Sequence, residues 1–363
     1  MIVGLAMGTT VTIGRAVGAG DSKKVSKTVG NTTVLFLGVS ILLAGMLLFL
    51  VRPIVSVMST PTEAVDGTIR YLTICFIGIP FITAYNVIAS IFRGMGDSKS
   101  PMYFIALACV INIGLDYLFM GAMHMGPAGA ALGTTLSQTI SVIISLWVIL
   151  KKQTGITMKK ADFSPEKQTM GQVLKIGIPI AAQDGFIQIA FIIITIIANR
   201  RGLSAAAAVG IVEKIISFLF LVPSSMLSTV SALGAQNMGA GKYDRADQIL
   251  RCAMGIAVGF GVCVAVLIQF IAEPVVGLFT TDTMVVILGA QYIRGYIWDC
   301  IFAGMHFSFS GYFCAYGKSE ISFIHNLIAI LCVRIPGCIL LRSFSQIRCF
   351  LWDWQQRRDL CFP

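Results

Sequence analysis

The sequence predicts an all-α membrane protein built as two similar helical bundles, which together cross the bilayer about ten times. Composition is the first observation: of the 363 residues, 56% are hydrophobic and only 12% are charged, whereas about a quarter of the residues in a soluble domain are charged. The second is a series of long apolar runs, and the third is an internal repeat. Together they exclude a soluble globule and a disordered chain, which needs low hydrophobicity.

Each apolar run predicts one spanning helix, because a helix needs about 20 apolar residues to cross the hydrocarbon core. The runs are 29–51, 71–92, 101–123, 127–150, 173–198, 204–233, 252–272, 285–313 and 321–341, and a shorter stretch at 1–13 makes ten. They are too continuous for the alternating strands of a membrane barrel, and a helix satisfies its own backbone hydrogen bonds in lipid. Pro80, Pro179 and Pro223 lie within or near the start of such runs and predict kinks.

The basic residues of the loops predict the orientation of the chain. Counted along alternate loops, sixteen lie on one side of the membrane, and they are Arg15, Lys23, Lys24, Lys27, Arg93, Lys99, Lys151, Lys152, Lys159, Lys160, Lys167, Lys175, Lys242, Arg245, Arg251 and Lys318. Only four lie on the other, namely Arg52, Arg70, Arg200 and Arg201. Because basic loops face the cytoplasm, the net charge of +10 mainly reflects orientation. We therefore expect a multi-pass protein of the cell (inner or plasma) membrane with no nucleic-acid partner.

The internal repeat has a constant offset of 221 residues. It carries Gly18-Ala19-Gly20 onto Gly239-Ala240-Gly241, Pro53 onto Pro274, and Gly96 onto Gly317. Gly18 and Gly96 suit tight turns or close approaches of the backbone. The repeat predicts an N-terminal lobe at 1–150, a cytoplasmic linker at 151–172 and a C-terminal lobe at 173–341. Repeats whose matching loops lie on the same side are related by an axis along the membrane normal, which predicts a cleft between the lobes that holds the substrate near the membrane midplane.

Five motifs at loops and helix ends now point to a known family. GRAVGAGDSKKVSK (14–27) is echoed by GAQNMGAGKYDRAD (234–247), and the others are FRGMGDSKSPM (92–102), MGPAGAALGTTLSQ (125–138) and KIGIPIAAQ (175–183). In this order, and with this repeat, the chain resembles the MATE (multidrug and toxic compound extrusion) family of secondary transporters over residues 1–337.

The resemblance implies a fold of twelve helices in two lobes of six. It also implies export of cationic or amphipathic small molecules in exchange for Na⁺ or H⁺, by rocking of the lobes, with no cofactor other than the coupling ion and no enzymatic activity. We expect a monomer in the lipid bilayer. By this comparison the chain begins inside the second helix and ends after the eleventh, so the acidic coupling residue that the family carries on its first helix has no counterpart here.

The last residues depart from the family. After VRIPG (333–337) an apolar twelfth helix is expected, but a segment rich in arginine and tryptophan follows, and its charges would lie on the outer side. We interpret 342–363 as an aberrant tail produced by a shift of reading frame in or just after 338–342, and resequencing would test this.

Polar residues inside the predicted spans are the candidates for binding, because ionisable groups at bilayer depth are costly and commonly functional. In the second lobe these are Asp184 with Gln188 one turn further on, Glu213, and Asp299 with His306 on the same helix face. Burial favours the neutral form of a carboxylate, so protonation or Na⁺ binding could compete there with a cationic drug. We expect Asp184, Glu213 and Asp299 to form an acidic cluster; the alternative for Asp184 is a hydrogen bond to a neighbouring helix.

In the first lobe, Asn86 and Gln138 are neutral polar candidates for the same role, whereas Asp116 lies near a helix end and is predicted to be interfacial. The cysteines and histidines show no spacing typical of a zinc site, and the sequence leaves metal ligands unassigned.

Three alternatives to drug export stay open. A flippase of lipid-linked saccharides from the same superfamily would carry several cations in its cavity, and only Lys214 and Arg294 lie at depth. A membrane-embedded enzyme would need a motif such as HExxH, which does not occur. A non-functional transporter fragment is the third, because helices are missing from both ends of the expected twelve.

Overall fold

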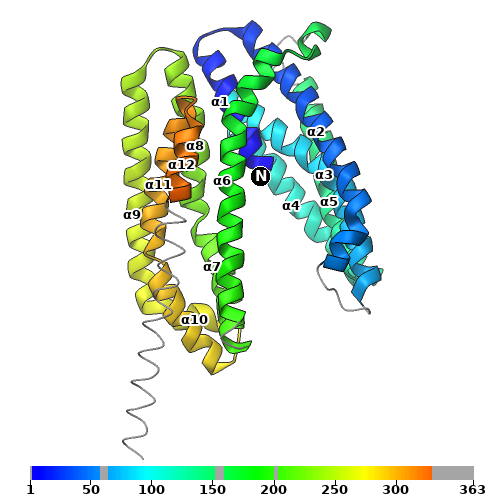
Figure 1. The fold of residues 1–363 in the computed structure, drawn as a ribbon, viewed down its shortest axis with the longest axis vertical. Coiled ribbons are helices and arrows are strands. Elements are labelled where there is room, and N and C mark those ends of the chain that lie inside the picture. The colour runs from blue at the N-terminus through cyan, green and yellow to red at the C-terminus, as the bar shows by residue number, and fades with distance from the viewer. Residues whose placement is uncertain (1, 58–63, 152–158, 200–202, 329–363) are drawn as a thin grey trace, which may run out of the picture.

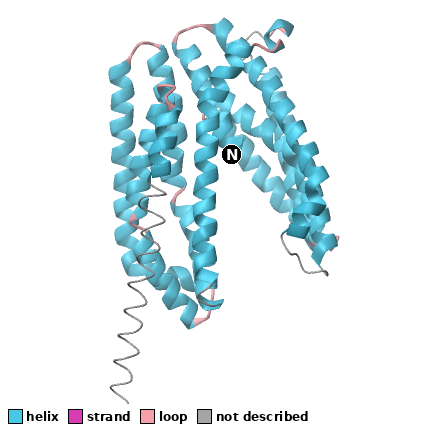
Figure 2. Ribbon diagram, in the orientation of Figure 1, coloured by secondary structure: helices cyan, strands magenta, loops and turns pink. Residues whose placement is uncertain are grey.

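The computed structural model describes residues 2–57, 64–151, 159–199 and 203–328, and this part of the chain contains helices and turns but no strand (Figure 2). The α-helices are α1 (Ile2–Gly18), α2 (Ser22–Val57), α3 (Val65–Met95), α4 (Lys99–Asp116), α5 (Pro127–Lys151), α6 (Lys167–Asn199), α7 (Leu203–Leu219), α8 (Leu221–Gly239), α9 (Tyr243–Gly277), α10 (Thr283–Tyr296), α11 (Asp299–Ala315) and α12 (Ser319–Ile328). A π-helical turn, Tyr117–Ala122, continues α4, and a short 3₁₀ turn, Lys160–Phe163, precedes α6.

The helices agree with the predicted apolar runs, and six in the described residues are long and apolar enough to cross a membrane. Two predicted spans are interrupted. One breaks at Phe220, between α7 and α8, where Pro223 lies in the first turn of α8. The other breaks between Tyr296 and Asp299, where no proline occurs. Pro80 and Pro179, by contrast, lie inside α3 and α6 without ending them.

The helices form two groups, α1–α5 and α6–α12, hereafter the first and second groups. They meet at the end of the molecule that carries the α1–α2 and α8–α9 turns, and diverge toward the opposite end (Figure 1). The helix α1 lies between them, because it packs on α2 and α3 of its own group and on α6 and α8 of the other.

The offset of 221 residues recurs in the hydrogen bonds of the two groups. Thr10 Oγ1 donates to the carbonyl oxygen of Ser90 at 3.1 Å, and Ser231 Oγ donates to that of Gly311 at 3.2 Å. Both donor and acceptor are thus shifted by 221 positions. The turn after α3 has Gly96 at φ 92°, and the turn after α11 has Gly317 at φ 69°, a conformation that favours glycine.

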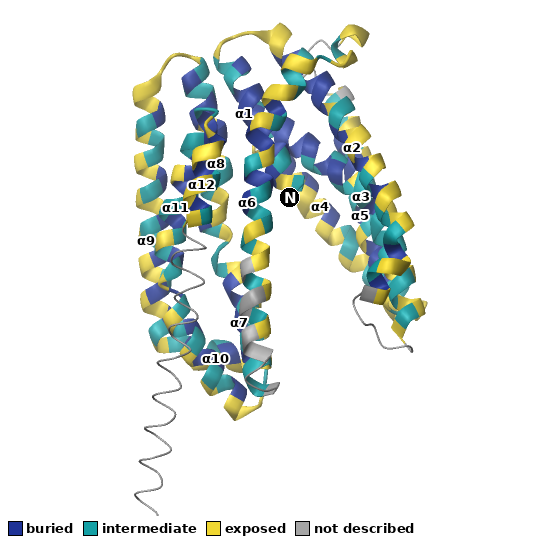
Figure 3. Ribbon diagram, in the orientation of Figure 1, coloured by how far each residue is buried: buried dark blue, intermediate teal, exposed yellow. Residues whose placement is uncertain are grey.

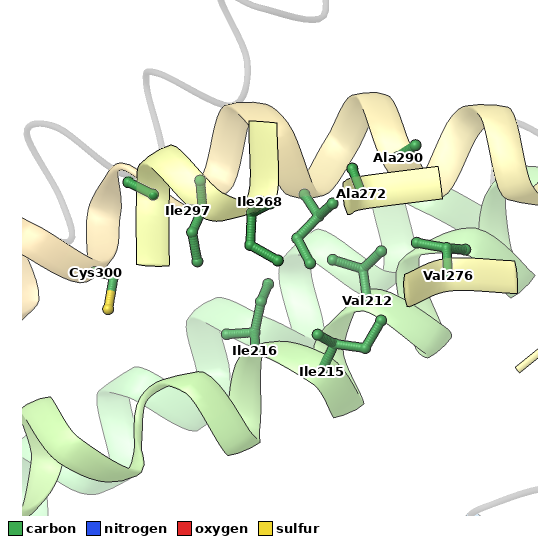
Figure 4. Packing of buried hydrophobic residues seen from close by; sticks show 11 residues of the cluster. Val212, Ile215, Ile216, Ile268, Ala272, Val276, Ala290, Ile297 and Cys300 are labelled. Carbon is green, nitrogen blue, oxygen red and sulfur yellow. The ribbon is translucent and has the colours of Figure 1, made fainter. Parts of the chain in front are cut away.

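Apolar side chains are distributed as expected for a protein in lipid. Large ones remain uncovered on outward faces, among them Phe49 (86% exposed) and Phe270 (79%), and Figure 3 shows such exposure along the outer helices. Figure 4 shows one interior cluster, in which Val212 of α7 packs with Ile268 of α9 and Ala290 of α10. Lipid tails are as apolar as these side chains, so close van der Waals packing holds such helices together.

Some sequence predictions concern residues outside the described part. The tail at 342–363, the end of the last predicted span after Ile328, and linker residues 152–158 belong to this set. The frame-shift interpretation therefore stays a prediction.

Candidate functional site

Glycines of α1 allow the two groups to approach each other to backbone contact. A Cβ added at Gly8 would overlap the carbonyl oxygen of Val173 on α6, and one added at Gly18 would overlap that of Gln236 on α8. A Cβ at Gly4 would lie 2.8 Å from the Cα of Ala181. Small residues at such spacing are typical of close helix crossings in membranes.

The crossing of α1 with α8 is internally symmetric. Arg15 Nε donates to the carbonyl oxygen of Ala315 at 2.9 Å, and Gln236 Nε2 donates to that of Gly94 at 2.8 Å. Positions 15 and 236, like 94 and 315, differ by 221. The same reciprocity holds for Gly18 and Gly239, because a Cβ at Gly239 would overlap the carbonyl oxygen of Arg15. Each group thus bonds to the other through equivalent residues.

The basic loops gather at this end. Lys27 Nζ forms an ion pair with Glu166 Oε1 at 2.6 Å, and Asn31 Nδ2 donates to the carbonyl oxygen of Asp162 at 3.2 Å. These contacts attach the segment before α6 to α2. The hydrogen bond from Lys27 lowers the pKa of Glu166 below its usual value. The positive-inside rule predicts that this end faces the cytoplasm.

A pocket of about 390 Å³ lies at the same end. It is lined from both groups, by Arg15, Asp21 and Lys24 on one side and by Tyr243 and Tyr316 on the other. Its place differs from the predicted substrate cleft, which was expected near the midplane.

Asp184 lies where α6 faces α1, and a Cβ added at Gly4 would lie 2.9 Å from Asp184 Oδ2. Its neighbour Gln183 is almost fully buried at 1% exposure and bonds to Ser322 and His306. Gln188, predicted to share the face of Asp184, is exposed. The structure therefore places a polar layer between α6, α11 and α12 at Gln183, the residue before Asp184, which the sequence interpretation did not select.

The predicted acidic cluster of Asp184, Glu213 and Asp299 is wrong. No group of three acidic, histidine or cysteine side chains that could hold a metal ion occurs in the described residues. Glu213 Oε1 accepts a hydrogen bond from Thr195 Oγ1 at 3.1 Å. Thr195 is eleven residues, or roughly 16 Å of helix, beyond Asp184 on α6, so the two carboxylates lie at different depths. Asp299 begins α11, at the break in the predicted run 285–313.

Arg294 and Lys214, the two basic residues predicted to lie at bilayer depth, have different surroundings. Arg294 Nε donates to the carbonyl oxygen of Gln269 at 3.2 Å, and its Nη2 lies 3.3 Å from Glu273 Oε1. Lys214 is exposed on α7.

In the first group, the two predicted residues lie on α3 and α5. Asn86 Nδ2 donates to the carbonyl oxygen of Ile82, one turn earlier on the same helix, at 2.8 Å. Gln138 Oε1 is buried and has no hydrogen-bond partner among the described residues. Buried polar atoms of this kind are uncommon and call for an explanation.

The structure adds two residues that the sequence interpretation missed or placed elsewhere. Asn112 and Asp116 lie one turn apart on α4, and both approach Gly133 of α5. Asp116 Oδ1 and Asn112 Nδ2 are buried without a hydrogen-bond partner in the described structure. Asp116 is the last residue of α4 and packs against a neighbouring helix; its predicted interfacial depth stays a prediction. The i,i+4 spacing of an amide and a carboxylate in an apolar run was a signal that could have found the pair.

Comparisons with known proteins agree on one family. A model of the MatE family matches residues 1–118 and 179–340. The probable multidrug resistance protein YpnP of Bacillus subtilis is 30% identical over 347 residues, which cover 94% of this chain and 77% of the relative. The multidrug export protein MepA of Staphylococcus haemolyticus is 26% identical over an alignment that covers 96% of this chain and 77% of the relative.

Solved structures show the same fold. An outward-facing MATE transporter of the MOP superfamily matches 92% of this chain and 74% of its own, with a TM-score of 0.87 and 23% identity. A MOP superfamily transporter from Pyrococcus furiosus matches 100% of this chain and 85% of its own, with a TM-score of 0.86 and 22% identity. The reverse polarity of the binding pocket in the Pyrococcus transporter suggests a different function for that protein, so this fold alone does not determine the substrate.

Proposed function

The chain belongs to the MATE family of multi-pass membrane transporters, and on that premise we propose that it exports cationic or amphipathic small molecules in exchange for Na⁺ or H⁺. The named relatives support the class of substrate, since they carry multidrug resistance or multidrug export in their names. The protein would act as a transporter and not as an enzyme, and the ion gradient would drive the export.

The arrangement of the two groups supports alternating access. They contact each other at the end with the basic loops and diverge toward the other end (Figure 1). We infer that this arrangement is the outward-facing state, in which the cytoplasmic side is closed. Export requires a second state in which the α1–α8 crossing separates.

Asp116 carries the proposal of ion coupling in the first group. A buried carboxylate oxygen without a partner is costly, and a bound proton or Na⁺ would remove the cost by neutralising it. The amide of Asn112 and the backbone of Gly133, which has no Cβ in the way, lie next to it. A cationic drug competes with the ion for the same negative charge, so binding of one releases the other.

Asp184 is the corresponding proposal in the second group. It lies on α6 where that helix faces α1 across the interface. A charge change there acts directly on the contact that must open, and this links ion binding to the conformational change.

Efflux of ethidium from a pump-deficient bacterium tests the function. The wild-type chain is expected to lower cell fluorescence, and imposed Na⁺ and H⁺ gradients identify the coupling ion. Asp116→Asn and Asp184→Asn, which keep the side-chain volume, should abolish the response to the gradient. Asp66→Asn, an exposed carboxylate in the first turn of α3, is the matched control.

Wild-type expression without any efflux would contradict the export function and favour a non-functional fragment. Efflux by both variants that still follows the gradient would contradict the assignment of Asp116 and Asp184. The flippase alternative has less support, because Arg294 is engaged by Gln269 and Glu273.

A further inference from the structure

A chain of polar contacts crosses the second group between α6, α11 and α12, and α12 packs against both of the others (Figure 1). Ser310 Oγ lies 2.6 Å from Ser322 Oγ, and Ser322 Oγ donates to Gln183 Oε1 at 2.9 Å. Gln183 Nε2 lies 3.3 Å from His306 Nε2, and His306 Nδ1 lies 2.9 Å from His325 Nδ1. The two imidazole planes differ by 23°, with centroids 4.9 Å apart.

The contacts determine where the protons lie when both histidines are neutral. Gln183 Oε1 accepts from Ser322, so the amide nitrogen of Gln183 points to His306 and can only donate. His306 Nε2 must then accept, which leaves the proton of His306 on Nδ1. That N–H donates to His325 Nδ1, and the proton of His325 is therefore on Nε2.

This chain of hydrogen bonds can accept one further proton only if the donor and acceptor atoms of the Gln183 amide exchange places. With three protons on the four ring nitrogens, one stays between the two Nδ1 atoms and each Nε2 carries another. His306 Nε2–H then faces Gln183, so the amide must turn its oxygen toward the ring. The amide nitrogen then donates to Ser322, whose hydroxyl turns toward Ser310. Every hydrogen bond is retained, so these five side chains can accommodate the histidine pair with either two or three ring protons.

The spacing suits a proton and not a metal ion. A tetrahedral zinc ion bound at about 2.0 Å by two imidazoles separates their nitrogens by about 3.3 Å, more than the 2.9 Å found here. No third ligand of a metal cluster accompanies the pair in the described residues.

Other titratable and charged residues lie on the helices that pack around His306 and His325. Those on the elements around the pair are Lys167, Lys175 and Asp184 on α6, Asp299 on α11, Glu320 on α12, and Arg15 on α1. The helix α8 has no titratable side chain. The helix α9 meets Gly304 of α11 at Ala257, within the uncharged stretch 253–257, and elsewhere Asp247 of α9 accepts a hydrogen bond from Tyr312 of α11. Histidine is the side chain that ordinarily exchanges its proton between about pH 5 and 8.

We propose that His306 and His325 form a proton-binding site of the second group, which shares one added proton and is positioned by Gln183. Gln183 precedes Asp184 in the chain, so reversal of its amide occurs beside the residue that faces α1. The site would make H⁺ the ion that the second group exchanges for a cationic substrate. This inference rests on the proposed antiport function.

Nuclear magnetic resonance of histidine-labelled protein in lipid nanodiscs tests the site without transport. The chain has only three histidines, and His124 lies outside the pair on the turn before α5. The signals of His306 and His325 should move together over two protonation steps, as coupled groups do. His325→Gln should convert His306 to a single step, whereas His124→Gln should change neither.

A replacement of Gln183 tests whether this residue positions His306 or only supports the fold. Gln183→Met retains the length of the side chain but removes the donor, so neutral His306 should lose its preference for the Nδ1–H tautomer, which the ring ¹⁵N shifts report. If His306 and His325 titrate independently in the wild type, and neither responds to replacement of the other, the proposal is wrong.

Ethidium efflux distinguishes failure of this proposal from failure of the function. With a proton gradient, His306→Gln and His325→Gln should lose the acceleration that the gradient gives, and His124→Gln should retain it. Gradient-driven efflux by both pair variants would overturn the coupling role, although the export function would stand. Absence of efflux from every variant and from the wild type would contradict the export function, while the titration still decides whether the pair binds a shared proton.

Discussion

Gly18→Ala and Gly239→Ala are expected to open the cytoplasmic contact between the two groups. In each case the added Cβ overlaps a backbone carbonyl oxygen of the other group, and backbone cannot move aside as a flexible side chain can. Ordinary contact needs about 3.5 Å between such atoms, so the helices must separate by more than about 1 Å. Overpacking of this kind costs about 1–3 kcal/mol, which lowers the population of the closed arrangement by roughly 5- to 150-fold.

Cys314 provides a native probe of this opening. It is 0% exposed and packs in the cluster that contains Met7 and Val11 of α1 together with Ala235 of α8. Separation of α1 from α8 uncovers it, so its labelling by a membrane-permeant maleimide, followed by peptide mass spectrometry, should accelerate in each variant by the factor given above. The double variant should accelerate less than the product of the two, because both substitutions act on one crossing.

Two controls distinguish opening from general loosening. Cys300 is equally buried, but it packs within the second group alone, so its labelling rate should not change. Gly255→Ala on α9, where nothing lies within 4 Å of the added Cβ, should leave both rates as they are. Labelling of Cys314 at the wild-type rate in both variants, or equal acceleration at Cys300, would refute the reasoning.

Two further predictions concern the same end of the molecule. Arg15→Met should accelerate labelling of Cys314 more than Gln236→Leu does, because a hydrogen bond from a charged donor contributes about 1.5–3 kcal/mol and one from a neutral donor about 0.5–1.5 kcal/mol; equal effects would contradict the assigned bonds. Since Lys27 lowers the pKa of Glu166, their contact stabilises the folded state above the usual glutamate value of about 4.3 and is lost as the pH falls through the lowered value. Hydrogen–deuterium exchange of residues 159–170, divided by the intrinsic exchange rate at each pH, should therefore rise on acidification, and Glu166→Gln should remove that dependence; a ratio that does not change with pH in the wild type would contradict it.

The candidate site was only partly predictable from sequence. Asp184 was selected because a carboxylate in an apolar run is conspicuous, and the structure places it at the interface between the groups. The expected cluster with Glu213 failed because sequence pattern gives the face of a helix but not the depth at which a neighbouring helix meets it. Asn112, Gln183 and His325 were missed because an amide or histidine gains significance from its partners, which come from other helices.

The broken spans show the same limit. The interruption before Pro223 has a local cause that sequence reveals, because proline removes a backbone hydrogen bond. The one between Tyr296 and Asp299 has no proline or glycine within it, and no local feature of the sequence explains it.

The sequence by itself predicted the membrane location, the order of the apolar runs, the orientation and the repeat. These depend on properties that add up along the chain: hydrophobicity over some 20 residues, charge in short loops and an offset of 221 between matching residues. Tertiary structure alone decided which end of the molecule is closed, through the reciprocal bonds of Arg15 and Gln236. It also decided which polar groups meet, because the depth and rotation at which two helices pack depend on side chains from both.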